Sequence, residues 1–337
     1  MKTAIVGLGP HGKRLLKVVL ENKILKLVGV VDLNRDVLGG LALDPELKFA
    51  SIDSVLEMKI DVLLIATNGP SHASLAIKAM EAGVRYVLVE KPMACSLFEC
   101  NSILEKARLL NVRLAVNKIN RFDEVYIFLK KKILGGEWGT LRSIYIQKPG
   151  IGLGCLGTHS FDLVNYLSNE NPISISAWLD APIMPNPRGV EFIDPGGLVI
   201  LRYKGFNAIV SQIEDGAGPN TIEIHLTGAR IFYDPKNSIL DVRLRDLTRK
   251  VGPGNPPAYF QYVPPESLNL KGDMIKQLSL VVSELIGADN PMICDGIHGR
   301  NAFEVLVASY LSHSRGNVPV SLPLTDPTEF ELYLPVT

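Results

Sequence analysis

The residues with the most evident chemical potential follow a run of β-favouring side chains in YVLVEKPMACS, residues 86–96. The Val and Leu run ends at once in Glu90, Lys91 and Pro92, although a strand that turns into a helix usually ends in small turn-forming residues. A primary amine at the carboxyl end of a buried strand can exchange a proton with a bound hydroxyl group. The end of such a strand lies at the ligand crevice of a doubly wound sheet, and a surface Glu–Lys pair stiffened by proline is the simpler interpretation.

A glycine-rich turn lies near the amino terminus, in GLGPHG, residues 7–12. Gly7, Gly9 and Gly12 form the pattern G-x-G-x-x-G between a β run and a helical pattern. The first glycine of this pattern permits a tight turn, the second lets a pyrophosphate approach the backbone, and the third allows close packing of helix on strand. The helix start also supplies N–H donors and a partial positive charge. The turn thus indicates a dinucleotide site, with a glycine turn that binds nothing as the alternative.

Asp32 ends the second β run, about 20 residues after the glycines, where an acidic side chain accepts hydrogen bonds from the adenosine ribose. The same carboxylate disfavours a 2′-phosphate, because like charges about 4 Å apart repel by on the order of 1 kcal/mol in water and more strongly at lower dielectric. Arg35 could compensate, but it could equally pair with Asp36 or Asp32. The sequence therefore favours NAD over NADP as the cofactor.

Residues 1–118 alternate short apolar runs with helical patterns. Continuous Val, Leu and Ile is typical of parallel strands covered on both faces, and such runs lie at 3–7, 27–32, 61–67, 86–90 and 113–117. Helical patterns cover 71–83 and 96–111, and Ser96 with Glu99 forms a capping box at the start of the second. Strand–helix alternation with short links predicts an α/β fold, a doubly wound parallel sheet of the Rossmann type over residues 1–120.

The pattern changes at about residue 121. Apolar and polar residues now alternate with a period of two, in runs at 173–178, 198–203, 208–213 and 221–226. Such alternation is typical of antiparallel strands with one covered face. Residues 121–337 are therefore expected to form a second, α+β domain with an open, mostly antiparallel sheet. His225 falls on the polar face of its strand, where a sheet surface or a subunit interface is favoured over catalysis.

These features occur together in the order of a known family. The tripeptide Glu90-Lys91-Pro92 resembles the signature of the Gfo/Idh/MocA family of NAD(P)-dependent oxidoreductases. Four longer stretches are also similar to that family. Residues 66–99 resemble its run from the fourth strand through the cofactor site, and residues 120–134 resemble its crossover into the second domain. Residues 152–167 resemble its Asp-x-Gly-x-His-x-x-Asp segment, and residues 295–324 resemble its closing helix and strand. The resemblance covers nearly the whole chain, except for the loops at 180–195 and 246–272.

The resemblance implies roles for individual residues. Lys91 matches the catalytic lysine, and its bond to Pro92 would be cis. Thr67, Asn68 and His72 match positions that line the cofactor, although His72 could instead cap the helix that follows it. The full set of expected cofactor-binding residues is Gly7, Gly9, Pro10, His11, Gly12, Asp32, Leu33, Arg35, Thr67, Asn68, His72, Glu90 and Lys91.

The segment GCLGTHSFDLVNY, residues 154–166, departs from the family at one position. His159 and Asp162 match the family's His and second Asp, but Cys155 stands where the family has its first Asp. That Asp helps to hold the substrate hydroxyl, whereas a thiol is a weak hydrogen-bonding group and largely neutral at pH 7. Cys155 can be a neutral pocket-lining residue, it can mark a site that binds without turnover, or it can have a metal-binding or covalent role. His159 is the second expected catalytic residue, with a helix-capping role as its alternative.

Two further side chains are expected at the substrate. Lys148 ends the run 143–148 where the family's pockets place polar contacts, and Arg121 could orient a substrate or brace the domain junction. The expected substrate-binding set is Lys91, Arg121, Lys148, Cys155, His159 and Asp162. No metal site is expected, because a catalytic zinc ion needs three protein ligands and no second cysteine lies near Cys155 in the sequence.

The composition limits which classes of binding partner and which cellular location we expect. Lys and Arg together number 35, as do Asp and Glu, so no net field attracts nucleic acid or an anionic membrane. There is neither a cleavable apolar segment nor a run of about 18 apolar residues, and the four cysteines lack paired or metal-type spacing. A reducing cytoplasm is therefore the expected location. The resemblance also implies a homo-oligomer, a dimer or tetramer formed through the open sheet, and the tail EFELYLPVT could be an intersubunit arm.

The predicted function is that of an NAD(P)-dependent dehydrogenase or reductase acting on CH–OH groups, with NAD favoured. Hydride would pass between nicotinamide C4 and a carbinol or keto carbon of a small molecule, a sugar, a cyclitol or a sugar derivative. Lys91 would take or return the hydroxyl proton, while His159 orients the substrate. The alternatives are a non-catalytic dinucleotide- or sugar-binding protein, motivated by Cys155, and a reductase of imines or conjugated double bonds on the same scaffold.

Overall fold

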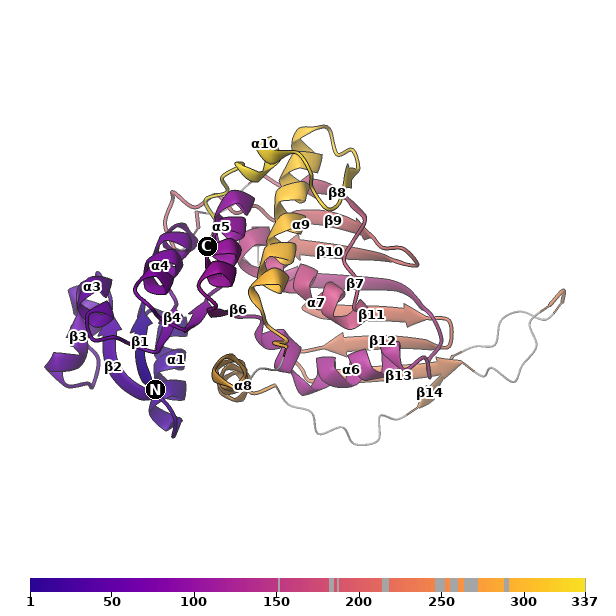
Figure 1. Cartoon of the computed structure of the whole chain (residues 1–337). Helices are drawn as coiled ribbons and strands as arrows, with labels where there is room; N and C mark the ends of the chain where they lie inside the picture. The colour runs from indigo at the N-terminus through magenta and orange to yellow at the C-terminus, as the bar shows by residue number, and fades with distance from the viewer. Residues whose placement is uncertain are drawn as a thin grey trace. The chain divides into compact units, whose positions relative to one another are not determined.

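Contacts between residues divide the chain into two compact units (Figure 1). The computed structural model describes residues 1–150, 152–181, 185–186, 188–213, 218–245, 252–254, 260–263, 272–287 and 291–336. Unit 1 contains Met1–Phe122, Asp273–Phe303 and Asp326–Thr337, and unit 2 contains Asp123–Gly272 and Glu304–Thr325. The sequence-based division assigned every residue after 120 to the second domain, whereas these contacts return two later segments to unit 1.

A six-stranded sheet forms the centre of unit 1. Its order is β3-β2-β1-β4-β5-β6, and all neighbouring strands are parallel. The strands are β1 (Lys2–Val6), β2 (Lys26–Val31), β3 (Lys48–Phe49), β4 (Val62–Ile65), β5 (Tyr86–Val89) and β6 (Arg113–Val116). All four side chains of β4 are buried, as expected for a parallel strand with both faces covered. The predicted doubly wound sheet is confirmed, and the predicted strand ends are correct to within two residues.

Side-chain caps explain where several helices of unit 1 begin. The helices are α1 (Pro10–Glu21), α2 (Arg35–Gly39), α3 (Ile52–Leu56), α4 (Gly69–Glu81), α5 (Leu97–Leu109), α8 (Met274–Ile286) and α10 (Pro327–Phe330), with 3₁₀ turns at η1 (Pro45–Leu47) and η2 (Ile119–Phe122). Ser96 Oγ accepts from the Glu99 N–H at the start of α5, as the capping box predicts. The Glu99 carboxylate, however, accepts from the N–H of Cys95 rather than from that of Ser96.

Helix α8 packs within unit 1 although it follows unit 2 in the sequence. Its apolar face joins the hydrophobic core around the parallel sheet through Leu278, Val281, Val282 and Leu285. Arg113, at the start of β6, donates hydrogen bonds of 3.0 Å to the carbonyls of Glu284 and Leu285 in the last turn of the helix. A cation is favourable at this end of a helix. Core packing and this cap together explain why the later segment belongs to unit 1.

A nine-stranded mixed sheet forms the centre of unit 2. Its order is β14-β13-β12-β11-β7-β10-β9-β8-β15, and the neighbouring strands are antiparallel except for β7 and β10, which are parallel. The strands are β7 (Leu141–Pro149), β8 (Ser174–Leu179), β9 (Gly197–Arg202), β10 (Asn207–Ile213), β11 (Thr221–Leu226), β12 (Ala229–Asp234), β13 (Ile239–Arg245), β14 (Phe260–Val263) and β15 (Val320–Ser321). The predicted open, mostly antiparallel sheet is confirmed.

The two faces of the unit 2 sheet differ in their covering. Helices α6 (Glu124–Leu134) and α7 (Thr158–Ser168) pack together, and α7 contacts β7 and β10 (Figure 1). A π-helical turn, η3 (Gly152–Gly157), leads into α7, and α9 (Gly296–Ser314) begins in unit 1 and ends in unit 2. The other face carries the alternate, partly exposed side chains, which include His225 beside Tyr145 at 5.5 Å between ring centroids. His225 therefore lies on the polar face of its strand, as predicted.

Two properties complete the description of the fold. All four cysteines are buried, and none forms a disulfide. Among the described residues, no helix combines the length and the hydrophobicity that crossing a lipid bilayer requires.

Candidate functional site

The carboxyl ends of four neighbouring strands bring most of the predicted cofactor-binding residues of unit 1 to one edge of its sheet. Strands β2, β1, β4 and β5 are adjacent in that order and run parallel. Asp32 follows β2, the glycine turn follows β1, Thr67 and Asn68 follow β4, and Glu90 with Lys91 follows β5. Parallel sheets bind their ligands at this edge.

The glycine turn has the shape that a pyrophosphate requires. Gly7 has φ +87°, and a Cβ there would lie 2.6 Å from the backbone of Ala66. A Cβ on Gly12 would lie 1.8 Å from the Gly7 carbonyl oxygen, so both positions exclude any side chain. A Cβ on Gly9 would meet nothing within 4 Å, and no side chain caps the start of α1 at Gly9. The first N–H groups of α1 and the open space at Gly9 therefore fit an anionic phosphate.

The Asp32 carboxylate braces this turn. Its Oδ2 accepts from the Leu8 N–H at 2.7 Å, and its Oδ1 accepts from the Asn34 N–H at 2.9 Å. A carboxylate oxygen has two lone pairs, so both oxygens can still accept from a ribose hydroxyl. Of the flanking residues predicted to contact the cofactor, Leu33 is 91% exposed and Arg35 is exposed at the start of α2.

Glu90 and Lys91 are both buried at the end of β5, being 5% and 7% exposed. Asn117, which follows β6, donates from Nδ2 to Glu90 Oε1 at 2.6 Å, and His11 Nδ1 of α1 lies 3.7 Å from the same oxygen. The Lys91–Pro92 bond is cis, as the resemblance implied. The simpler interpretation, a solvated surface pair, is therefore wrong. Sequence reasoning missed Asn117, although its position after a predicted strand was a usable signal.

His72 lies inside unit 1 and is fully buried. Its Nδ1 faces the Pro92 carbonyl at 2.7 Å, and its Nε2 faces the Thr67 carbonyl at 3.0 Å. Burial lowers the pKa of this imidazole, which the two carbonyls oppose. The side chain thus joins the end of β4 to the residue after Lys91. It does not cap α4, whose start at Asn68 has no side-chain hydrogen bond, and neither of its ring nitrogens faces outward.

Arg121 belongs to unit 1 and lies in η2. Its side chain is 4% exposed, and Nη1 donates to the Ile293 carbonyl at 2.9 Å. This hydrogen bond ties η2 to the segment between α8 and α9 within unit 1, so the predicted bracing of the domain junction stays a prediction. Its predicted contact with substrate stays a prediction.

In unit 2, a buried carboxylate holds the turn that leads to His159. Asp194 is 6% exposed and accepts from the Gly154 N–H at 2.6 Å and from the Cys155 N–H at 2.7 Å. A Cβ on Gly152 would lie 2.1 Å from Asp194 Cγ, so the turn closes directly over the carboxylate. Sequence reasoning missed Asp194, because a single Asp in a loop carries no local signal of such a contact.

The predicted substrate residues of unit 2 lie on consecutive turns. Cys155 is in η3 and 5% exposed, Asp162 is in α7 and 2% exposed, and His159 is partly buried between them. Lys148 follows Ile144 and Ile146 on the covered face of β7, since residues two apart share a face. Burial lowers the pKa of Lys148 to about 8. This amine lies on the face of β7 that α7 contacts.

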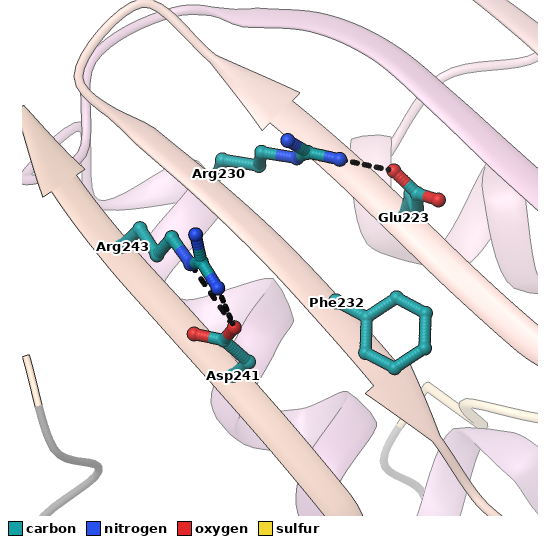
Figure 2. Close-up of a pocket in the computed structure, with 5 residues that line it drawn as sticks. All are labelled: Glu223, Arg230, Phe232, Asp241 and Arg243. Atoms are coloured by element: carbon teal, nitrogen blue, oxygen red, sulfur yellow. Dashed lines mark hydrogen bonds and ion pairs between the residues drawn. The ribbon is translucent and has the colours of Figure 1, made fainter. Parts of the chain in front are cut away.

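Within the described part of the chain, no group of three or more His, Cys, Asp or Glu side chains is arranged to hold a metal ion. The hollow drawn in Figure 2 lies elsewhere in unit 2, on strands β11, β12 and β13. It has a volume of about 350 Å³ and is lined by Glu223, Arg230, Phe232, Asp241 and Arg243. None of these five belongs to the predicted site.

Comparison with known proteins supports the interpretation of unit 1. A family model described as an oxidoreductase family with an NAD-binding Rossmann fold, that of Gfo/Idh/MocA, matches residues 1–118. Residues 1–118 are similar to this oxidoreductase family. The predicted resemblance is thus confirmed over this region, and with it an NAD(P)-binding fold.

Proteins similar to this chain include dehydrogenases. An inositol 2-dehydrogenase/D-chiro-inositol 3-dehydrogenase of Halalkalibacterium halodurans is 27% identical over 59% of this chain, and the match spans 64% of that enzyme's length. An uncharacterized oxidoreductase of Bacillus subtilis is 22% identical over 97% of this chain and 98% of its own. The solved dehydrogenase WlbA of Bordetella pertussis, in complex with NADH and UDP-GlcNAcA, has a TM-score of 0.75 at 20% identity and covers 96% of this chain and 99% of its own. This last likeness shows the shared fold.

The Asp194 contact predicts how unit 2 responds to a carboxylate at position 155. A Cys155→Asp variant would add a second carboxylate to the buried turn whose Gly154 and Cys155 N–H groups bind Asp194. Like charges a few ångströms apart repel by about 3–4 kcal/mol at an effective dielectric of about 20. We expect Cys155→Asp to lower the free energy of unfolding at pH 7 by about 2–3 kcal/mol relative to Cys155→Ser. Because one carboxyl group then has a raised pKa, by about 1.4 kcal/mol per pKa unit, this destabilisation should diminish as the pH falls below about 6.

Urea denaturation of a double-mutant cycle measures this interaction. Asp194→Asn alone should destabilise the protein, since one amide oxygen replaces the two carboxylate oxygens that accept from two N–H groups. In the Cys155→Asp background the same change should instead recover part of the lost stability. Equal stability of Cys155→Asp and Cys155→Ser at pH 7 would contradict the contact.

Proposed function

We propose that this chain is an NAD-dependent oxidoreductase that transfers hydride between nicotinamide C4 and a carbinol or keto carbon of a sugar, a cyclitol or a sugar derivative. One observation carries the proposal: the glycine turn, Asp32, Thr67 and the Glu90–Lys91 pair share one edge of a parallel sheet. The match of residues 1–118 to an oxidoreductase family model supports an oxidoreductase. The dehydrogenase of Halalkalibacterium halodurans acts on a cyclitol by its name, which supports this class of substrate.

The proposed roles follow from the chemistry of the side chains. A bound nicotinamide dinucleotide supplies the hydride acceptor or donor. Lys91 exchanges the hydroxyl proton, since a primary amine can be both acid and base. Glu90, held by Asn117, provides a buried negative charge next to it in the sequence. His159 orients the substrate hydroxyl, and the short hydrogen bonds from Gly154 and Cys155 to Asp194 hold the turn that precedes it.

We further propose NAD rather than NADP as the cofactor. Asp32 is already fixed by its hydrogen bonds to the Leu8 and Asn34 N–H groups, so its charge cannot easily turn away from a ribose 2′-phosphate. Repulsion of like charges about 4 Å apart is on the order of 1 kcal/mol in water and larger in a partly buried site. Arg35 is exposed and would have to approach the phosphate to offset that repulsion.

A second candidate function, binding without turnover, is favoured by Cys155. The thiol is buried at a position where the family resemblance expects a carboxylate, and it is a weak hydrogen-bonding group. In this alternative the chain binds a dinucleotide or a sugar but does not transfer hydride. The assay described next separates the two functions, since the binding protein would bind NADH and produce no product with any substrate.

The proposed function predicts that Lys91→Met removes turnover but not cofactor binding. Methionine keeps most of the apolar stem of this buried residue and removes the amine. We expect kcat on an authentic polyol or keto-sugar to fall by about 10²–10⁴-fold, the usual contribution of a general acid–base group, with an NADH dissociation constant within about threefold of that of the wild type. The measurement is a steady-state assay of a panel of polyols, cyclitols and keto-sugars with NAD and with NADP.

Lys17→Met is the matched control, because the Lys17 side chain is 59% exposed on α1 and should leave kcat unchanged. NAD should give the higher kcat/KM. If Lys91→Met had the kcat of the wild type, Lys91 would have no role in the proton transfer. If the protein reduced an imine or a conjugated double bond and acted on no alcohol or ketone, it would be an imine or double-bond reductase instead.

We also propose a homo-oligomer formed through the outer face of the unit 2 sheet. Large side chains are exposed on alternate positions of its strands: Tyr145 is 40%, Trp178 43% and Leu198 36% exposed. On the same face Arg230 and Arg243 lie directly opposite each other and hydrogen-bond Glu223 and Asp241 (Figure 2). A surface with exposed aromatic groups and arginine is typical of protein interfaces.

A charge on that face should therefore weaken the oligomer. We expect Leu198→Lys to shift the protein toward monomer in sedimentation velocity at micromolar concentration, because an unpaired ammonium would be buried in the interface. Leu134→Lys is the control, since Leu134 is 50% exposed at the end of α6 rather than on the sheet. An unchanged sedimentation coefficient for Leu198→Lys would contradict this interface.

A further inference from the structure

The end of the chain packs into unit 1 beside the loop that follows Lys91. Leu334 is 3% exposed and Val336 is fully buried, whereas Tyr333 is 51% exposed. Two side chains of residues 333–336, called the C-terminal peptide below, are therefore buried within unit 1. The role of the tail as an intersubunit arm stays a prediction, and these two side chains pack within their own unit. Burying an aliphatic side chain of this size is worth about 1.5–3 kcal/mol, which is enough to hold the peptide in place.

The C-terminal peptide makes its polar contacts with Cys95. The Leu334 N–H donates to the Cys95 carbonyl at 2.7 Å, and the Cys95 thiol donates to the Val336 carbonyl at 3.9 Å. Burial raises the pKa of Cys95 to about 11, so the sulfur keeps the proton that it donates. The N–H of Cys95 in turn donates to Glu99 at 2.8 Å. Cys95, four residues after Lys91, is thus held by the C-terminal peptide through its carbonyl and thiol and by Glu99 through its N–H.

Gly69 shows how closely three segments meet. A Cβ on Gly69 would lie 2.6 Å from the Val336 carbonyl oxygen, 3.3 Å from Cys95 Sγ and 3.4 Å from Pro92 Cγ. A backbone oxygen at 2.6 Å leaves no room for any side chain, so the approach of the C-terminal peptide requires glycine here. The start of α4, the loop after Lys91 and the C-terminal peptide therefore share one buried contact point.

Two of these segments carry predicted site residues. Thr67 and Asn68 directly precede Gly69, and Lys91 directly precedes Pro92. From within unit 1, His72 already joins the Thr67 and Pro92 carbonyls. The C-terminal peptide adds a second connection between the same two segments, through Gly69 and Cys95. If the start of α4 or the loop after Lys91 changed its conformation, the amine of Lys91 would move relative to the glycine turn.

We propose that the C-terminal peptide is a positioning element for Lys91, holding the Pro92–Ser96 loop against the start of α4 so that the amine keeps one orientation at the sheet edge. This inference rests on the proposed role of Lys91 in proton transfer. The peptide itself contacts no substrate. Its effect is to limit the conformations of a loop that lies between a strand and a helix.

The experiment compares the wild type with a chain that lacks residues 332–337. Acetylation by acetic anhydride, followed by mass spectrometry, gives the labelling rate of Lys91, which is 7% exposed, relative to that of Lys17, whose side chain is 59% exposed. We expect removal of the peptide to raise this ratio by about fivefold or more, because the loop opens locally. We expect kcat to fall by about tenfold or more, because small displacements of a catalytic group are costly, while the NADH dissociation constant changes by less than about threefold.

Gly69→Ala tests the same contact with the peptide present and covers the case in which the shortened chain does not fold. The added methyl group should displace the Val336 carbonyl and give the same two effects in weaker form. Gly39→Ala is the matched control, because a Cβ on Gly39 meets nothing within 4 Å. It should leave both the labelling ratio and kcat unchanged.

The outcomes separate this inference from the proposed function. Wild-type labelling ratios and kcat in both the shortened chain and Gly69→Ala would overturn the positioning role and leave the proposed function intact. If the wild type turns over no substrate, the proposed function fails, and the Lys91 labelling ratio alone then decides whether the C-terminal peptide positions this loop.

Discussion

Parallel strands must all end at the same edge of their sheet, and this constraint determines where the chemistry of unit 1 can occur. Adjacent strands cannot be joined by tight turns, so each is followed by a crossover that begins at that edge. With the order β3-β2-β1-β4-β5-β6, the residues after β2, β1, β4 and β5 become neighbours. The glycine turn, Asp32, Thr67 and Lys91 are distant in the sequence and close in the fold for this reason alone.

Buried hydrogen bonds then fix the segments that leave this edge. Asp32 holds the glycine turn through the Leu8 N–H, and Asn117 holds Glu90. His72 lies between the Pro92 and Thr67 carbonyls, and as a neutral imidazole it donates to one of them. Buried polar groups are stabilising only when they have partners, so each of these contacts resists any displacement of the loops. The loops at this edge are therefore held together by contacts between neighbouring segments.

Local patterns in the sequence predicted much of this arrangement, and contacts between distant residues account for what was missed. Continuous apolar runs located the strands of unit 1, and alternation located those of unit 2, because both patterns reflect which faces are covered. Asp194 and the C-terminal peptide carry no such pattern: a single carboxylate and two apolar residues near a terminus acquire their roles only from their partners. His72 was assigned to the cofactor by resemblance, whereas its burial between two carbonyls shows a bracing role that sequence spacing could not reveal.

The central claim is that the open space at Gly9 is where a dinucleotide phosphate binds, and a titration of NADH against Gly9→Val measures this most directly. Because a Cβ on Gly9 meets nothing within 4 Å, valine should leave the thermal midpoint close to that of the wild type. It should weaken NADH binding by about tenfold or more, since the second glycine of the turn is the one that lets a pyrophosphate approach the backbone. Gly39→Val, at a position with equal space, should bind NADH as the wild type does. Wild-type affinity for NADH in a folded Gly9→Val protein would contradict the account.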